Sequence, residues 1–265
     1  MNHVTAGQYY PVDSPVHGVD PRAKLIALFL YYVLLFFCRD FYTYLYATML
    51  CAASMALSKV PVKVYFRAVK LLLLFIALAA VFAMLFTTGT ALLQIGIFKM
   101  TQEGLAVAGR MAARLTLILF SALILTFTTT PLSLTAGLER LFTPLKKLGA
   151  PVSELAMMMA IAIRFIPVML AEAETTLQAQ QSRGADLYTG SLLKRGKNLL
   201  PLLLPLFIGA FRRSEELADA MEARGYRSDV SRTTFRLLRY GAKDVAVIAA
   251  FLLFLVLMLI YRWFL

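Results

Sequence analysis

Residues 71–86 read LLLLFIALAAVFAMLF, a run without a charged side chain, a glycine or a proline. At about 1.5 Å per residue the run covers ~24 Å, and its flanks can complete a hydrocarbon core ~30 Å thick. The stretch therefore predicts a membrane-spanning helix. Of the 265 residues, 60% are hydrophobic and 16% are charged, whereas soluble domains carry about 25% charged residues. This composition excludes an ordinary soluble domain and a disordered or collagen-like chain.

Four further apolar stretches predict four more membrane helices, so that residues 1–130 form a membrane domain and the chain ends in a last span. The four stretches lie near 25–38, 41–57, 115–130 and 245–265. The first is short, but Lys24 and Arg39 flank it, and their side chains can extend along the helix to lipid headgroups. Residues 91–98 are too short to cross and are expected at the membrane interface. The predicted fold class is an all-α membrane protein with about five spans.

Residues 131–244 hold 16 of the 27 basic and 11 of the 15 acidic residues. This change in composition predicts a helical domain at the membrane face. With the N-terminus inside, 22 basic residues fall on the cytoplasmic side and five on the other, so the positive-inside rule places this domain in the cytoplasm and the C-terminus outside. A net charge of +12 could indicate a nucleic-acid binder, but repeated apolar runs favour a membrane protein and no nucleic-acid partner.

Two amphipathic helices are predicted in this domain, near 155–182 and 206–224. Their apolar faces repeat at helical spacing. The first face is Ile163, Ile166, Leu170, Ala173 and Leu177, and the second is Phe207, Ala210, Ser214, Leu217 and Met221. The helices match at an offset of 41 residues, which pairs Glu174 with Glu215, Arg183 with Arg224, and Gly184 with Gly225.

Each of these helices ends in a small residue, an arginine and a glycine. The two tips are Ser182, Arg183 and Gly184, and Ala223, Arg224 and Gly225. Glycine ends a helix in a left-handed conformation, and arginine offers a planar fork of five donors, as a docking tip requires. The alternative is that each arginine neutralises the negative end of its own helix dipole and each glycine is a routine cap.

The paired tips, together with Arg164, Pro167 and the N-terminal string GQYYPVDSPVHGVDPRAKL at 7–25, resemble the transmembrane T component (EcfT/CbiQ family) of energy-coupling factor transporters. The motif Asp20, Pro21 and Arg22 is part of that string. The resemblance implies a non-catalytic subunit of a bacterial or archaeal plasma membrane. It also implies two ABC-type ATPase partners, which bind ATP and Mg, and one S component that captures a vitamin or metal ion. The two arginine tips would lodge in grooves on the ATPases, with Arg164, Pro167, Glu174 and Glu215 as supporting positions.

Other activities have weaker support in the sequence. GSLLKRGKN at 190–198 has five residues between its glycines, not the four of a phosphate-binding GxxxxGK[ST] loop, and is interpreted as a basic loop facing the membrane. Histidine occurs only at positions 3 and 17, so no metal site or histidine-based catalytic set is expected within the membrane, and no cofactor. A dedicated cobalt, nickel or biotin T component and a self-sufficient secondary carrier remain as alternatives.

Overall fold

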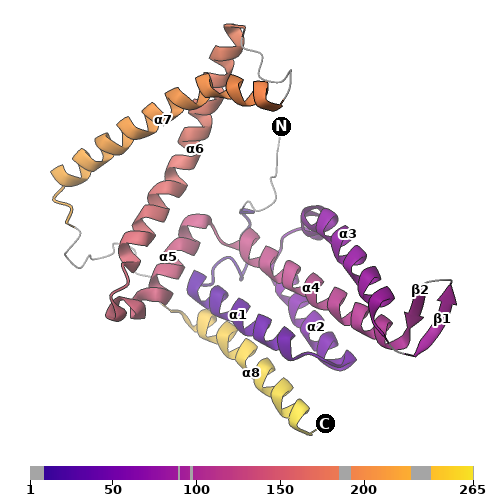
Figure 1. The fold of residues 1–265 in the computed structure, drawn as a ribbon. Coiled ribbons are helices and arrows are strands. Elements are labelled where there is room, and N and C mark those ends of the chain that lie inside the picture. The colour runs from indigo at the N-terminus through magenta and orange to yellow at the C-terminus, as the bar shows by residue number, and fades with distance from the viewer. Residues whose placement is uncertain (1–8, 89, 96–97, 185–191, 228–239, 265) are drawn as a thin grey trace. The chain divides into compact units, whose positions relative to one another are not determined.

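The computed structural model of the chain describes residues 9–88, 90–95, 98–184, 192–227 and 240–264 (Figure 1). The described residues form helices and one two-stranded hairpin. Four helices are long and apolar enough to cross a membrane, which confirms the expected all-α membrane protein. The chain divides into two compact units. One is Met1–Leu141 with Leu238–Leu265, and the other is Phe142–Leu237.

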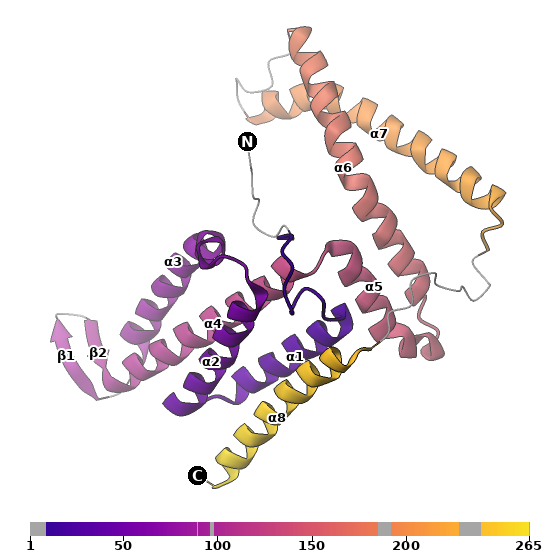
Figure 2. The ribbon, with the colours of Figure 1, turned by 180° about the vertical axis from the view of Figure 1, so that it is seen from behind.

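The first unit contains a helix at each of the five positions where the sequence predicts a span. Its helices are α1 (Pro21–Phe37), α2 (Phe41–Ser58), α3 (Val62–Phe86), α4 (Gln102–Thr128), α5 (Pro131–Phe142) and α8 (Ala242–Phe264). Helix α1 packs against α8 on one side and against α2 and α4 on the other, and α3 packs along α4 (Figures 1 and 2). The core of the unit therefore lies around α1 and α4.

Two pairs of buried polar groups in this core satisfy each other, as a hydrocarbon environment favours. The Tyr31 hydroxyl donates to the Ala47 carbonyl at 3.0 Å, and the Tyr65 and Ser58 hydroxyls lie 3.0 Å apart. Helix α3 instead leaves most of its leucines exposed, with Leu71 at 67%. A helix so apolar and so exposed suits contact with lipid.

The close packing of α3 on α4 depends on Gly104. A Cβ atom at this position would lie 2.6 Å from the Met84 carbonyl oxygen and 2.7 Å from Thr101 Oγ1. Thr101 is the N-cap of α4, and its hydroxyl accepts from the Gly104 N–H at 3.1 Å while donating to the Thr87 carbonyl at 2.8 Å. Only a residue without a side chain fits between these groups.

The set of candidate spans differs from the sequence prediction. The four helices that meet the requirements of length and composition are α3, α4, α8 and α6 (Val152–Ser182). Helices α1 and α2, with 17 and 18 residues, are not among them. The sequence predicted an amphipathic helix near 155–182 and no span there, but Pro167 lies inside one continuous helix of 31 residues, whose apolar part is long enough to span.

The segment that the sequence analysis expected at the membrane interface forms a β-hairpin, which the sequence prediction missed. Strand β1 (Ala91–Ile95) pairs antiparallel with β2 (Phe98–Thr101), and the register shifts between Ala91 and Leu93. The hairpin connects the end of α3 to the start of α4 (Figure 1). Its backbone groups pair with each other, so a connection too short for a membrane helix still satisfies many of its hydrogen bonds.

The second unit contains η1 (Thr143–Leu148), α6 and α7 (Leu192–Ala223). Helix α7 begins well before the predicted start at residue 206, and both Pro201 and Pro205 lie inside it. It changes direction along its length in both views, as expected where proline interrupts the backbone bonds (Figures 1 and 2). Residues 192–198 are therefore helical and not a loop, while residues 190 and 191 lie outside the described residues.

The boundary between the units also differs from residue 131, where the sequence placed the start of the second domain. Helix α5 belongs to the first unit. A Cβ atom at Gly137 of α5 would lie 3.0 Å from the Pro21 Cβ atom of α1. This close approach explains why α5 stays with the membrane helices.

Candidate functional site

Helices α6 and α7 end in the same backbone motif. Gly184 has φ +83° and Gly225 has φ +73°, both in the left-handed region that glycine adopts most readily. The Gly184 N–H donates to the Gln181 carbonyl at 2.9 Å, and the Gly225 N–H donates to the Glu222 carbonyl at 2.8 Å. The match predicted from sequence therefore extends to the geometry of the two caps.

The arginine preceding each glycine is exposed. In the described part of the chain, the guanidinium groups of Arg183 and Arg224 form no hydrogen bond or ion pair, although the Arg183 backbone N–H bonds to Ala179 and Gln180. Ser182 and Ala223, which precede them, are also exposed. Each tip thus presents an exposed guanidinium, without a partner among the described residues, next to a small side chain, and a partner surface could bind it.

The helices of the second unit are joined where α6 meets α7. Arg213 Nη2 lies 2.8 Å from Glu172 Oε2 in an ion pair whose side chains are 31% and 26% exposed. Gly209 lies beside it, and a Cβ atom there would come within 2.8 Å of Glu172 Oε1. The sequence analysis did not single out this pair. The sequence feature that could have revealed this pair is the offset of 41 residues, because it also relates Glu172 to Arg213.

An apolar groove of about 600 Å³ lies between α6 and α7. Its α7 wall includes Ala210, Ser214, Leu217 and Met221, which belong to the predicted apolar face. Its α6 wall is Met157, Ile161, Phe165 and Met169. The predicted α6 face was therefore wrong in register, because Ile166 and Leu170 point elsewhere and are 56% and 60% exposed.

The four supporting positions do not gather into one site. Arg164, Glu174 and Glu215 are exposed, and Pro167 lies inside α6. Pro167 lines a second cavity with Glu172 and Arg213, which places it next to the ion pair and away from the arginine tips.

The motif Asp20, Pro21 and Arg22 forms the start of α1. The Asp20 carboxylate caps the helix by accepting from the Arg22 backbone N–H at 2.9 Å, and it also accepts from the Arg22 guanidinium at 3.0 and 3.1 Å. Pro21 occupies the first turn, where its missing N–H costs nothing. Burial alone would raise the pKa of Asp20, but the hydrogen bonds from Arg22 and its positive charge outweigh burial and hold that pKa below its usual value.

This motif connects three helices of the first unit. The Asp20 N–H donates to Asp244 Oδ1 near the start of α8 at 2.7 Å, and the Arg22 guanidinium lies 4.2 Å from the Tyr240 ring centroid. Lys24 Nζ donates to the Thr128 carbonyl at the end of α4 at 2.8 Å. Asp20, Lys24 and Asp244 are each at most 8% exposed. The motif and Lys24 together therefore fix the ends of α1, α4 and α8 to one another.

Lys24 does not reach for headgroups as the sequence analysis expected. Its ammonium group also donates to Thr129 Oγ1 at 3.3 Å and to the His17 carbonyl at 3.4 Å, so all three of its protons have acceptors. The sequence analysis expected the Lys24 side chain to extend toward headgroups, because the sequence shows only the helix that carries the lysine and not its neighbours. The acceptors come from α4 and from the N-terminal segment.

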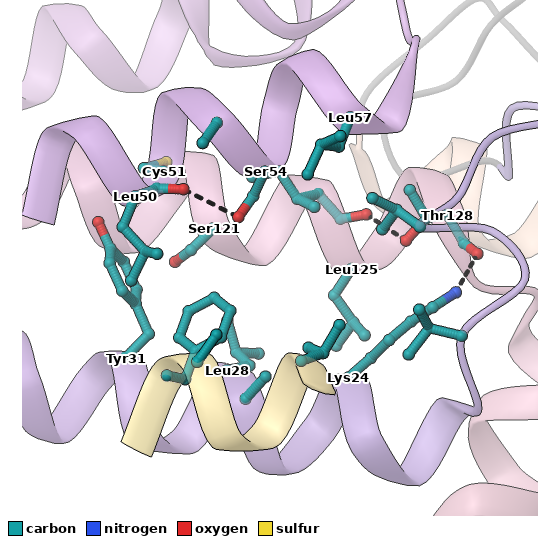
Figure 3. A pocket seen from close by; sticks show the side chains of 18 residues that line it. Lys24, Leu28, Tyr31, Leu50, Cys51, Ser54, Leu57, Ser121, Leu125 and Thr128 are labelled. Carbon is teal, nitrogen blue, oxygen red and sulfur yellow. Dashed lines mark hydrogen bonds between the residues drawn. The ribbon is translucent and has the colours of Figure 1, made fainter. Parts of the chain in front are cut away.

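A cavity of about 230 Å³ lies between α1, α2, α4 and α8 (Figure 3). Lys24 stands at one end with its bond to Thr128, and Tyr31 and Cys51 stand at the other (Figure 3). Leu28, Leu50, Leu57 and Leu125 are among the side chains that make most of the lining apolar. Ser54, which also lines the cavity, donates to the Leu50 carbonyl at 2.9 Å. The cavity offers no unpaired charge to a polar ligand.

Comparison with known proteins identifies the family. The model of the cobalt transport protein family, CbiQ, matches residues 13–235. A protein of Ruminiclostridium cellulolyticum is 42% identical over 93% of this chain and 92% of its own length. A protein of Acidaminococcus fermentans is 42% identical over 99% of this chain and 98% of its own length. A protein of Limosilactobacillus fermentum is 42% identical over 98% of this chain and 98% of its own length.

All three relatives carry the name energy-coupling factor transporter transmembrane protein EcfT. The stretch matched by the family model, residues 13–235, covers residues of both units, from the segment before α1 to beyond the end of α7. The chain therefore belongs to the EcfT/CbiQ family of energy-coupling factor transporter transmembrane proteins.

Proposed function

We propose that this chain is the coupling subunit of an energy-coupling factor importer of the ABC type, and that it takes up vitamins or other micronutrients with its partners. Two cytosolic ATPase subunits bind ATP and Mg, and a membrane-embedded S component captures the cargo. This chain binds no cofactor and catalyses no reaction. It transmits the motion of the ATPases to the S component.

The observation that carries the proposal is the pair of equivalent helix ends. Two exposed guanidinium groups, Arg183 and Arg224, follow helices with the same cap geometry and have no partner among the described residues. Two such helix ends fit two similar binding surfaces, and a pair of ATPase subunits would provide them. Charge-assisted bonds to a groove would let each helix move with the subunit that holds its arginine.

The crossing of α6 and α7 supports transmission of this motion. The Glu172–Arg213 ion pair joins the two helices, and Gly209 allows them to approach closely. A displacement of one arginine tip would therefore move the other helix through the Glu172–Arg213 ion pair. The same displacement would change the groove between α6 and α7. In this proposal α6, although long and apolar enough to span a membrane, lies on the cytoplasmic side with the rest of Phe142–Leu237 and with the N-terminus. The C-terminus lies outside the cell, as the distribution of basic residues favours.

The test is copurification from native membranes. A tagged chain is compared with the double variant Arg183→Glu, Arg224→Glu, and all copurifying proteins are identified. We expect two nucleotide-binding subunits with the unmodified chain and their loss from the double variant. The matched control is Arg212→Glu, because Arg212 is exposed on α7 and only forms a surface pair with Glu216 at 3.9 Å. Equal ATPase retention by the double variant and the control would contradict the proposal.

A second candidate is a dedicated cobalt transporter subunit, which the description of the matching family favours. The mechanism would be the same, and the cargo would be a metal ion held by a different S component. The same copurification separates the candidates, because the S component retained with the chain can be tested for binding of cobalt or of vitamins. Uptake by the reconstituted chain alone would instead support a self-sufficient carrier.

A further inference from the structure

Three arginines gather in a cavity of about 490 Å³ in the first unit, where the end of α1 meets the first half of α4. Arg39 follows α1, and Arg110 and Arg114 are one helical turn apart on α4. The remaining lining residues are Cys38, Val107, Met111 and Leu115. No carboxylate lines this cavity, so three positive charges face one space without a negative charge from the described residues.

Arg114 has a buried donor without an acceptor. Its Nη2 donates to the Cys38 carbonyl at 3.0 Å, but its Nε is buried and has no hydrogen-bond partner among the described residues. Buried donors in proteins are nearly always paired, and a guanidinium donor is costly to leave unpaired. Arg39 and Arg110 are exposed and make no ion pair in the described part of the chain. The carboxylate of Glu103, also on α4, bonds to Thr90 instead.

The position of these arginines indicates where their partner comes from. Lys24 and Cys38 are 14 positions apart, which places them about 21 Å apart along α1. A typical hydrocarbon core is ~30 Å thick. This length of α1 is shorter than the core, and a bilayer can adjust to a short apolar segment by thinning, which brings headgroups toward the arginines at the end of α1. Arg262 of α8 lies close to the same end of α1, with its guanidinium carbon 5.5 Å from the Phe37 ring centroid.

We propose that this cavity binds the phosphate of a phospholipid headgroup. Guanidinium forks match the geometry of phosphate oxygens, and the free Arg114 Nε–H with the exposed groups of Arg39 and Arg110 supplies donors from both helices. Val107, Met111 and Leu115 lie on the same wall and provide an apolar path for the upper part of an acyl chain. The site is distinct from the coupling tips and does not depend on the proposed function.

The test is native mass spectrometry of the purified full-length chain, titrated with three probes. These are phosphatidylglycerol, a diacylglycerol with the same acyl chains, and inorganic phosphate. The variant is Arg39→Gln, Arg110→Gln, because neither side chain has an ion-pair partner among the described residues whose loss would unfold the protein. The control is Arg67→Gln, an exposed arginine on α3 that does not line the cavity. A second variant, Arg114→Lys, keeps the charge but removes the Nε donor and the fork.

We expect the double variant to weaken the tightest phosphatidylglycerol binding about tenfold or more, and the control to leave it unchanged. Arg114→Lys should weaken it with less effect than the double variant. Diacylglycerol should not compete for this site. The proposal is overturned if the double variant binds phosphatidylglycerol as tightly as the control, or if diacylglycerol binds equally well. Displacement of the lipid by millimolar inorganic phosphate would overturn the assignment to a lipid and indicate a site for a free anion.

Discussion

Glu172 and Arg213, joined by a 2.8 Å ion pair between α6 and α7, occupy equivalent positions of two matched helices and are 41 residues apart in the chain. The same offset relates Arg183 to Arg224 at the helix ends. The two helices thus meet at one shared position of their common pattern and differ there in charge. Opposite charges at equivalent positions join two otherwise similar helices and would act as a pivot for both tips.

Reversing one charge at this pivot should uncouple transport. In Glu172→Arg two positive groups would face each other, and in Arg213→Glu two negative groups would. We expect either variant to lose most uptake by the complete transporter while both ATPases still copurify, because the arginine tips are untouched. The measurement is uptake together with ATPase retention. The exchanged double variant, Glu172→Arg with Arg213→Glu, should recover uptake, and failure of this exchange would show that the ion pair is not what matters.

The two terminal glycines should be sensitive to a single methyl group. Gly184→Ala and Gly225→Ala force a left-handed backbone on a residue with a Cβ atom, at a cost of about 1 kcal/mol. The affected chain can avoid this cost by changing the direction of the preceding arginine, so we expect weaker ATPase retention in copurification. Gly109→Ala is the control, because Gly109 lies inside α4 with no atom within 4 Å of an added Cβ. Equal retention by all three variants would contradict this explanation.

Lys24 should contribute to the stability of the membrane unit. Lys24→Met removes the bond to the Thr128 carbonyl and two further bonds, and leaves acceptors at the end of α4 without a donor. We expect the free energy of unfolding to fall by about 2 kcal/mol, which would be measured as a lower thermal midpoint in detergent. Lys63→Met, at an exposed position of α3, should leave the midpoint nearly unchanged. A midpoint of Lys24→Met equal to that of this control would show that the buried bonds add nothing.

Asp20 should make stability depend on acid pH. Its pKa in the folded chain lies below the ordinary value of 3.8, so the folded state favours the carboxylate. The stabilisation is therefore complete above about pH 3.8 and is lost as the pH falls through the lower folded pKa. Asp20→Asn should be less stable than the unmodified chain at neutral pH, and the difference in thermal midpoint should shrink in acid. A difference that stays constant with pH would exclude ionisation of Asp20 as its cause.

Gly104 should tolerate no side chain. Gly104→Ala places a methyl group 2.6 Å from the Met84 backbone oxygen, which cannot move without separating α3 from α4. We expect a destabilisation of about 1–3 kcal/mol, seen as a lower thermal midpoint. Gly109→Ala on the same helix again serves as the comparison, since it meets no neighbouring atom. If both alanine variants have the same thermal midpoint, α3 and α4 pack less closely than the contacts around Gly104 indicate.

The sequence determined the membrane class, the positions of the five predicted helices and the two matched arginine tips. These features are local, because uncharged length, helical periodicity and a glycine after an arginine act within one segment. The resemblance to the T-component family drew attention to Asp20, Pro21 and Arg22, and the structure showed that they cap and begin α1. The β-hairpin and the early start of α7 were missed because local breakers such as Pro201 were given too much weight.

Only the tertiary structure decided which side chains meet across helices. It turned Lys24 from a residue expected to reach headgroups into a buried donor to Thr128, and it joined Glu172 to Arg213. It also brought Arg39 to Arg110 and Arg114, which lie far from it in the chain. The periodicity of a sequence shows which face of a helix is apolar, but it does not show which other helix packs against that face. The neighbour depends on how α1, α4, α6 and α7 are arranged, and close contacts at Gly104 and Gly209 let the packed helices approach.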